Sequence, residues 1–254
     1  MATRFELVAH GTEPALLLAA AEAALEVVDE LAVRLSRFDP SGLLAHLRRV
    51  APRKVAVDAA TLSLFEDALA IAAWTDGRFD VTGGVGGLLV HSEEGAISLE
   101  SAATELDLGA IAKGHALDLA VAELRAAGVA GAFVHGGTSS GIALGSAVDG
   151  RPWRVALEGK LPAPVFELAD LAYSVSATHR VREGAAERHL RGRDGEPVAA
   201  TRTVAIVGPS GRVADAWATA VAAGAPRRLP AGPGWRGWIR DDDATWQPMP
   251  ESPT

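Results

Sequence analysis

The chain contains 254 residues, 48% of them hydrophobic, so its length allows one large core or two closely joined lobes. Its formal net charge of −8 argues against a general nucleic-acid binder, because such proteins present a basic face to phosphates. The absence of cysteine excludes disulfides, a thiolate nucleophile and thiolate metal ligands.

The N-terminal region shows no sign of a secretory or membrane segment. Residues 1–14, MATRFELVAHGTEP, lack an apolar run, and the Leu- and Ala-rich stretch that follows contains Glu22, Glu26 and Asp29. We therefore expect a cytoplasmic protein that does not insert into a membrane.

Hydrophobic periodicity predicts four helices. The first has Thr12 as its N-cap and Pro14 in its first turn, and its apolar residues are mostly three or four apart: Leu18, Leu25, Val28, Leu31 and Leu35. The second runs from about Asp58 to Trp74, and the face expected to be buried carries Leu62, Phe65, Leu69 and Ala72. The third starts within residues 105–118 and ends before Gly128, and the fourth runs from about Ala214 to Ala223.

Five short strands are expected between these helices, at residues 5–9, 130–134, 153–157, 171–176 and 203–207. Helices and strands do not alternate regularly and no block repeats at a fixed period, so an α+β fold is favoured over a doubly wound α/β fold. We predict a single domain over residues 1–254, in which the tail from Pro226 forms an edge strand or ribbon and then frays.

A pair of oxygen-bearing side chains in the fourth helix is the first candidate for chemistry. Asp215 and Thr219 are four residues apart, so they share one helix face, with about 5–6 Å between their Cβ atoms. A carboxylate and a hydroxyl suit Mg²⁺, which takes few protein oxygens and completes its shell with water and substrate phosphates. The alternative is an exposed Asp that the dipole favours near the helix start, with Thr219 bonding back to the carbonyl of residue 215.

The stretch ELDLGAIAKGHALD, residues 105–118, is the second candidate. Asp107 ends a strand-like segment, Gly109 makes a turn, and Lys113 enters the third helix. A helix N-terminus with a nearby lysine suits an anion, although the pattern is not a P-loop because Gly114 and His115 follow the lysine. The alternative is that Asp107 caps the turn and Lys113 is a solvated residue of the first helical turn.

Two glycine-rich loops add weaker signals. In RFDVTGGVGG, residues 78–87, Phe79 and Asp80 could hold a planar ring and its polar edge, or they could be a buried Phe beside a capping Asp. HGGTSSG, residues 135–141, follows an apolar strand, but paired glycines are common in tight turns. The histidines show no HExxH spacing, so a zinc site has little support, and a serine hydrolase is likewise not supported.

Five blocks of the sequence, in this order, resemble the ApbE family, the FAD:protein FMN transferases. They are LSRFDPSG at 35–42, GRFDVTGG at 77–84, DLGAIAKGHALD at 107–118, HGGTSSGIALG at 135–145 and TVAIVGPSGRVADAWATA at 203–220. The resemblance implies an α+β fold that binds FAD and Mg²⁺, moves FMN onto a Ser or Thr of a target protein and releases AMP. Such chemistry depends on in-line positioning and on neutralising the charge of the pyrophosphate.

The resemblance also implies roles for particular residues. The Mg²⁺ ligands would be Asp215, Thr219 and the backbone carbonyl of Ala110. The contacts with FAD would come from Asp107 and Lys113, and further from Arg78, Phe79, Asp80, Phe38, the segment around His10, and Leu190. The general base for the target hydroxyl would be His189, because HLRGRDGEPV at 189–198 lies where the family has HIldPrTGyPv.

That same segment is where the chain departs most from the family pattern. It is one residue shorter, and the usual Asp and Thr are missing. The stretch between GRFDVTGG and DLGAIAKG is also reduced, and Thr138 stands where the family often has Asp. Two alternatives therefore stay open beside the transferase: a hydrolase in which water attacks FAD to give FMN and AMP, and a non-catalytic flavin-binding or structural homologue.

Overall fold

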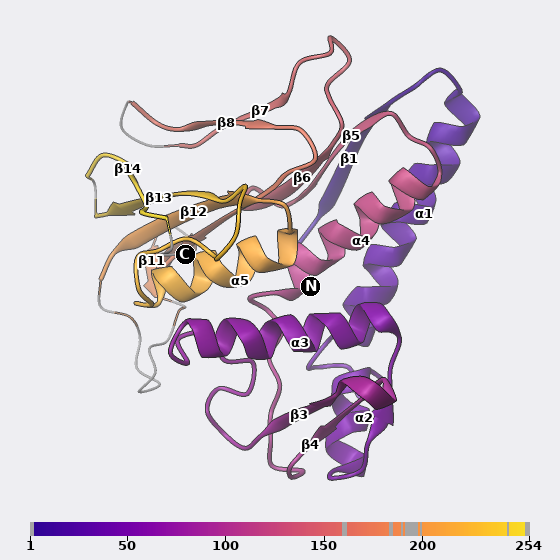
Figure 1. The fold of residues 1–254 in the computed structure, drawn as a ribbon, viewed down its shortest axis with the longest axis vertical. Coiled ribbons are helices and arrows are strands. Elements are labelled where there is room, and N and C mark those ends of the chain that lie inside the picture. Colours follow the sequence, from indigo (N-terminus) through magenta and orange to yellow (C-terminus); the bar gives the residue numbers. More distant parts are fainter. Residues whose placement is uncertain are drawn as a thin grey trace.

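The computed structural model describes residues 3–158, 162–182, 185–188, 190, 198, 200–242 and 244–251. Its centre is a seven-stranded sheet of order β1-β5-β6-β9-β12-β13-β14, in which every neighbouring pair is antiparallel. The strands are β1 (Phe5–His10), β5 (Gly131–Gly136), β6 (Ser140–Leu144), β9 (Ala172–Ala177), β12 (Arg202–Gly208), β13 (Arg236–Asp241) and β14 (Gln247–Pro248). Because helices are segregated to one face of this sheet (Figure 1), the α+β prediction is confirmed.

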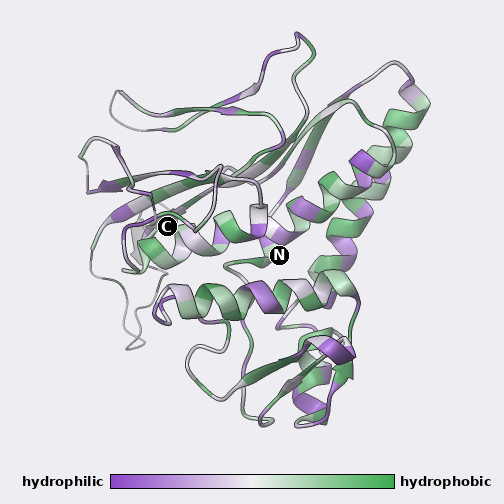
Figure 2. Cartoon of the chain, in the orientation of Figure 1, coloured by the Kyte–Doolittle hydropathy of each residue, from purple (hydrophilic) through white to green (hydrophobic). Residues whose placement is uncertain are grey.

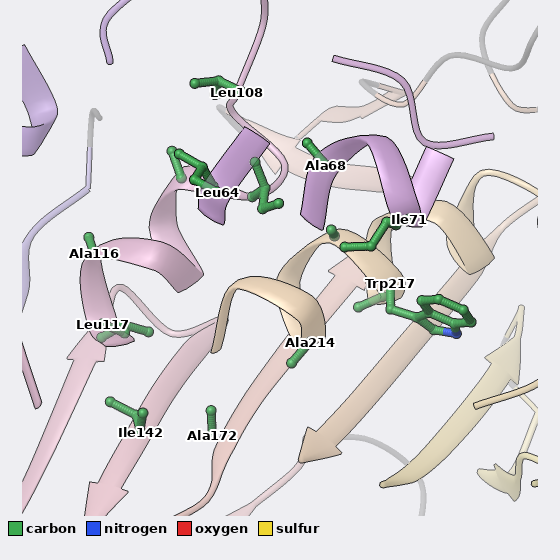
Figure 3. Packing of buried hydrophobic residues seen from close by; sticks show 14 of the residues in the cluster. Leu64, Ala68, Ile71, Leu108, Ala116, Leu117, Ile142, Ala172, Ala214 and Trp217 are labelled. Carbon is green, nitrogen blue, oxygen red and sulfur yellow. The ribbon is translucent and has the colours of Figure 1, made fainter. Parts of the chain in front are cut away.

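Four long helices build the layer beside the sheet. They are α1 (Pro14–Arg34), α3 (Ala59–Trp74), α4 (Ala112–Ala126) and α5 (Gly211–Ala222). Figure 1 shows α4 and α5 against the sheet and α3 beyond α5, and Figure 3 shows the buried side chains that fill the space between them. Alanines fill the buried face of α5, so this helix can approach both the sheet and α4 closely. Hydrophilic and hydrophobic residues alternate along α1 in Figure 2, as expected for a helix with one face toward solvent.

The other face of the sheet carries a two-stranded hairpin of β7 (Trp153–Ala156) and β8 (Val165–Leu168). Figure 1 shows this hairpin on the side of the sheet away from the helices. Phe166 and Leu168 are buried there against Tyr173 and Val207, in a second and smaller hydrophobic cluster. The hairpin therefore closes part of the second face.

A smaller unit lies beyond α3. It consists of α2 (Leu43–Val50) and a sheet of order β2-β4-β3, with β2 (Val55–Ala56), β3 (Leu88–His91), the 3₁₀ helix η1 (Ser92–Glu94) and β4 (Ala96–Leu99) (Figure 1). A separate hairpin pairs β10 (His179–Arg182) with β11 (Ala185–Arg188). Among the described residues, no helix is both long enough and apolar enough to cross a bilayer.

Several predicted boundaries hold and others are wrong. Asp58, the predicted start of the second helix, caps α3 by accepting a hydrogen bond from Thr61 N, and the tail contributes β13 and the edge strand β14, in line with the predicted edge strand or ribbon. Thr12 is not the cap of α1, because the helix begins one residue later, after Glu13, which makes no side-chain cap. The buried face of α3 is centred on Leu64, Phe65, Ala68 and Ile71, whereas Leu69 is exposed. Helix α2 and strands β2, β3 and β4 were not predicted from the sequence.

Candidate functional site

A cavity of about 1170 Å³ lies beside the first turn of α4 and the face of α5 that carries Asp215 and Thr219. Seven of the predicted site residues line it: Asp80, Asp107, Ala110, Lys113, Leu190, Asp215 and Thr219. They come from four separate segments between residues 80 and 219, and the sheet and the two helices bring them together.

Lys113 and Asp215 form an ion pair at the wall of this cavity. Lys113 Nζ donates to Asp215 Oδ1 over 2.7 Å, and it also contacts the hydroxyl oxygen of Ser140. The side chains of Lys113 and Asp215 are only 17% and 4% exposed. The sequence-based alternative of a solvated Lys113 is therefore wrong for this structure, because the ammonium is held between two buried partners.

Asp215 accepts hydrogen bonds on both carboxylate oxygens. Oδ1 accepts from Lys113 and, over 2.9 Å, from the hydroxyl of Ser174, while Oδ2 accepts from the backbone N of Gly114 over 3.1 Å. The residue lies in the second turn of α5, since the helix begins at Gly211 with Ser210 as its cap. The alternative of an Asp near the helix start does not hold, because the cap Ser210 lies four residues upstream of Ala214 and lengthens the helix.

The donor set around Asp215 fits a hard cation. A carboxylate offers about four lone-pair sites, and the three hydrogen bonds above leave one of them, on Oδ2, open. Thr219 lines the same cavity and its Oγ1 lies 2.8 Å from Ser176 Oγ, so the predicted back-bond to the carbonyl of residue 215 gives way to a bond with β9. The described residues contain no cluster of three or more His, Asp or Glu side chains suited to a metal. Any cation bound here would take few protein oxygens, as Mg²⁺ commonly does.

Asp80 and Asp107 line the cavity and also hold their own loops. Asp80 accepts hydrogen bonds from the backbone N of Thr82 and of Gly84, over 2.8 and 2.9 Å. Asp107 accepts from Gly109 N over 2.9 Å and pairs with Arg37 over 3.3 Å. Their capping role and their position in the cavity wall are compatible, because each carboxylate has lone pairs to spare.

The aromatic residues of the predicted site separate into two environments. Phe79 is 4% exposed and packs in the main core, which matches the alternative of a buried Phe beside a capping Asp. Phe38 is 81% exposed, with the guanidinium of Arg37 4.6 Å from its ring centre. Phe38 lines a neighbouring pocket of about 570 Å³, which shares Gly83 and Asp107 with the larger cavity. Arg78 is exposed and lies in the wall of neither space.

His10 is not brought to the site. The antiparallel register pairs His10 with Gly131 and Phe5 with Gly136, so His10 lies at the end of β1 away from Lys113. There its Nε2 lies 2.7 Å from the carbonyl oxygen of Ser146, and its ring centre is 6.2 Å from that of Trp153. His189 lies outside the residues that the structure describes, whereas its neighbour Leu190 reaches the cavity.

The sequence reading missed the serines that support the ion pair. Ser140 and Ser174 are buried, and their hydroxyl oxygens are 2.9 Å apart on the adjacent strands β6 and β9. It also missed His179, which lines the cavity and whose buried Nδ1 has no hydrogen-bond partner within the described part of the chain. Polar residues inside apolar strands were the available signal, because a buried hydroxyl in a strand needs a partner.

Comparison with known proteins agrees with this architecture. A model of the ApbE family matches residues 1–89 and 85–231. A curated FAD:protein FMN transferase from Rhodobacter capsulatus is 34% identical over 127 residues, which cover 47% of this chain and about a quarter, 24%, of that protein.

Solved structures share the fold. The crystal structure of the ApbE protein from Thermotoga maritima has a TM-score of 0.76 at 21% identity, covering 97% of this chain and 93% of that one. The flavin transferase ApbE from Vibrio cholerae has a TM-score of 0.72 at 18% identity, covering 98% and 97% of the two chains. Since the family model accounts for most of the sequence, this chain belongs to the ApbE family.

Proposed function

We propose that the chain transfers FMN from FAD to a Ser or Thr hydroxyl of a target protein, releases AMP, and uses Mg²⁺. The observation that carries the proposal is the ion pair of Lys113 and Asp215 in the wall of a large cavity that Ala110, Thr219 and Asp107 also line. The relative from Rhodobacter capsulatus, named as an FAD:protein FMN transferase, supports the same reaction.

Each residue has a task in this reaction. Lys113 presents a cation to the cavity, so its ammonium can pair with a pyrophosphate oxygen while Ser140 keeps the side chain in place. Asp215, Thr219 and the carbonyl of Ala110 would hold Mg²⁺, which supplies further neutralisation of the pyrophosphate charge when bound. Asp80 and Asp107 order two loops that also line the cavity.

The acceptor hydroxyl must lose its proton as it attacks phosphorus. We propose His189 as the general base, on the family resemblance of its segment. His179 is a second candidate, because its imidazole lines the cavity and its Nδ1 has no partner among the described residues. A proton acceptor has to lie within hydrogen-bond reach of the nucleophile, so substituting each histidine separately by Ala would show which one the transfer step needs.

The test is to incubate the purified chain with FAD and Mg²⁺, with and without a Ser/Thr-containing acceptor protein, and to follow AMP, free FMN and the mass of the acceptor. Transfer predicts AMP together with a mass increase of the acceptor equal to a bound FMN. AMP with free FMN and no mass increase would instead identify a hydrolase. No AMP under any condition would contradict both reactions and leave a non-catalytic homologue.

A further inference from the structure

Helices α4 and α5 touch through two short segments of the same pattern. Residues 114–118 read GHALD and residues 211–215 read GRVAD, so each segment has Gly four residues before Asp. A Cβ on Gly114 would lie 2.1 Å from the carbonyl oxygen of Gly211, and a Cβ on Gly211 would lie 2.7 Å from the carbonyl oxygen of Gly114. The two backbones are therefore in direct contact at this point, at a spacing that a side chain would prevent.

Each aspartate binds the glycine of the other helix. Asp215 Oδ2 accepts from Gly114 N over 3.1 Å, and Asp118 Oδ1 accepts from Gly211 N over 2.6 Å. The two hydrogen bonds are reciprocal, since each helix supplies both a donor and an acceptor.

Asp118 does more than mirror Asp215. Its Oδ2 accepts from Arg212 N over 3.1 Å and from the hydroxyl of Ser210 over 3.2 Å. Ser210 in turn accepts from Val213 N over 3.4 Å. The first three backbone N–H groups of α5, which have no partner within the helix, are thus bound by Asp118 and Ser210.

We infer that Asp118 is a positioning residue, which holds α5 on α4 so that Asp215 and Thr219 face Lys113 at the geometry of the reaction. Lys113 immediately precedes Gly114, and Thr219 lies one turn beyond Asp215, so a sliding of the two helices would displace both sides of the site together. A misplacement of about 1 Å can cost a reaction about a hundredfold in rate. The catalytic consequence rests on the proposed function, whereas the coupling of the two helices does not.

The coupling can be measured without any activity. The variants Asp118→Ala, Asp215→Asn and their combination are compared by urea unfolding in the absence of Mg²⁺ and FAD. Each variant raises the unfolding constant relative to the unmodified chain. If the reciprocal bonds act as one unit, the rise in the double variant is at least about fivefold smaller than the product of the rises in the two single variants. Effects that simply multiply would overturn the inference. If Asp118→Ala does not fold, Asp118→Asn, which keeps the side-chain shape, replaces it.

Asp58 provides a matched control. It caps α3, where its Oδ1 accepts from Thr61 N over 2.8 Å, and its other described partner is Arg34. Asp58→Ala also removes a helix cap, but its effect should multiply with that of Asp215→Asn. If the unfolding constant of the Asp58→Ala, Asp215→Asn double variant departs from the product of the single effects as much as that of the Asp118→Ala, Asp215→Asn double variant does, the coupling is not specific. That result would also overturn the inference.

A second measurement concerns the reaction. Asp118→Ala should lower kcat for AMP release tenfold to a hundredfold and reduce the Mg²⁺-induced rise in unfolding temperature, with little change in KM for FAD. Asp58→Ala should lower the unfolding temperature and leave kcat unchanged. Normal turnover and Mg²⁺ response in folded Asp118→Ala would contradict a positioning role. If the unmodified chain releases no AMP, the proposed function fails, and the unfolding comparison still decides whether the helices are coupled.

Discussion

His115 is a fully buried imidazole, and its environment predicts loss of stability in acid. Its exposed fraction is 0%, and neither ring nitrogen has a hydrogen-bond partner among the described residues. Burial, followed by the positive charge of Arg212, lowers the pKa of His115 from its usual 6.5 to about 4. Asp58 opposes this shift, and the more weakly acting charge of Arg34 adds to it. The folded chain therefore keeps this ring neutral.

The sign and size of the effect follow from linkage. The unfolded chain binds a proton on this histidine below about pH 6.5, whereas the folded chain binds it only near pH 4. The stability contribution is fully present above pH 6.5 and falls as the pH drops from 6.5 to 4. The two pKa values differ by about 2.5, and each pKa unit corresponds to about 1.4 kcal/mol, so about 3 kcal/mol of the free energy of unfolding is lost.

Urea unfolding between pH 4 and 7.5 tests this expectation. His115→Leu, which keeps an apolar side chain of similar size, should have a free energy of unfolding that depends less on pH, and the difference from the unmodified chain should approach about 3 kcal/mol across the range. His46→Leu is the control, because it makes the same substitution at a histidine that is only half-buried. Parallel stability curves for the unmodified chain and His115→Leu would refute the reasoning.

Three further outcomes are expected. Asp215→Asn should abolish Mg²⁺-stimulated AMP release and, because it leaves Lys113 without its buried partner, cost about 3 kcal/mol of stability in urea unfolding; Mg²⁺-dependent turnover in this variant would contradict the ligand assignment. Lys113→Ala should weaken FAD binding in fluorescence titration, and the ratio of the FAD affinity of the unmodified chain to that of the variant should shrink as salt is added. Equal affinities would contradict the assignment of Lys113 to the anion site. Phe38→Ala should leave the unfolding temperature within about a degree, since the ring is 81% exposed, but weaken FAD binding; unchanged binding would separate the smaller pocket from the cofactor.

The local patterns of the sequence were sufficient for the main helices and for seven of the residues that line the cavity. The i and i+4 spacing of Asp215 and Thr219 placed both on one face of α5, and the Lys113 segment lay at a helix N-terminus as expected. The predicted start of α5 at Ala214 was three residues late. The apolar run suggests that start, whereas Ser210 and Gly211 resemble loop residues although they are the cap and the first residue of the helix. His10 was misplaced because strand register, which no short motif records, decides which end of β1 meets the site.

What the sequence could not supply is the set of contacts between distant segments. Ser140 and Ser174 carry no spacing that links them to Lys113 or Asp215, and the Gly-to-Asp spacing that residues 114–118 and 211–215 share does not by itself reveal that the two segments touch. Yet the side chains of Ser140, Ser174 and Asp118 all hold the ion pair or the helices that bear it. Their roles depend on the sheet order and on the contact of α4 with α5, both of which are properties of the folded chain. The assignment of residues 1–254 to a single domain stays a prediction.

The ion pair explains how the site can exist before its ligands arrive. A buried carboxylate without a compensating charge is costly, and the side chain of Asp215 is only 4% exposed. Lys113 supplies that charge within the folded chain, while Ser174 and Gly114 N occupy two further positions of the carboxylate. A cation arriving at the open position on Oδ2 would compete with Lys113 for the same negative charge. The ammonium would then be freer to pair with a pyrophosphate oxygen, so the binding of cation and FAD should each favour the other in this proposed reaction.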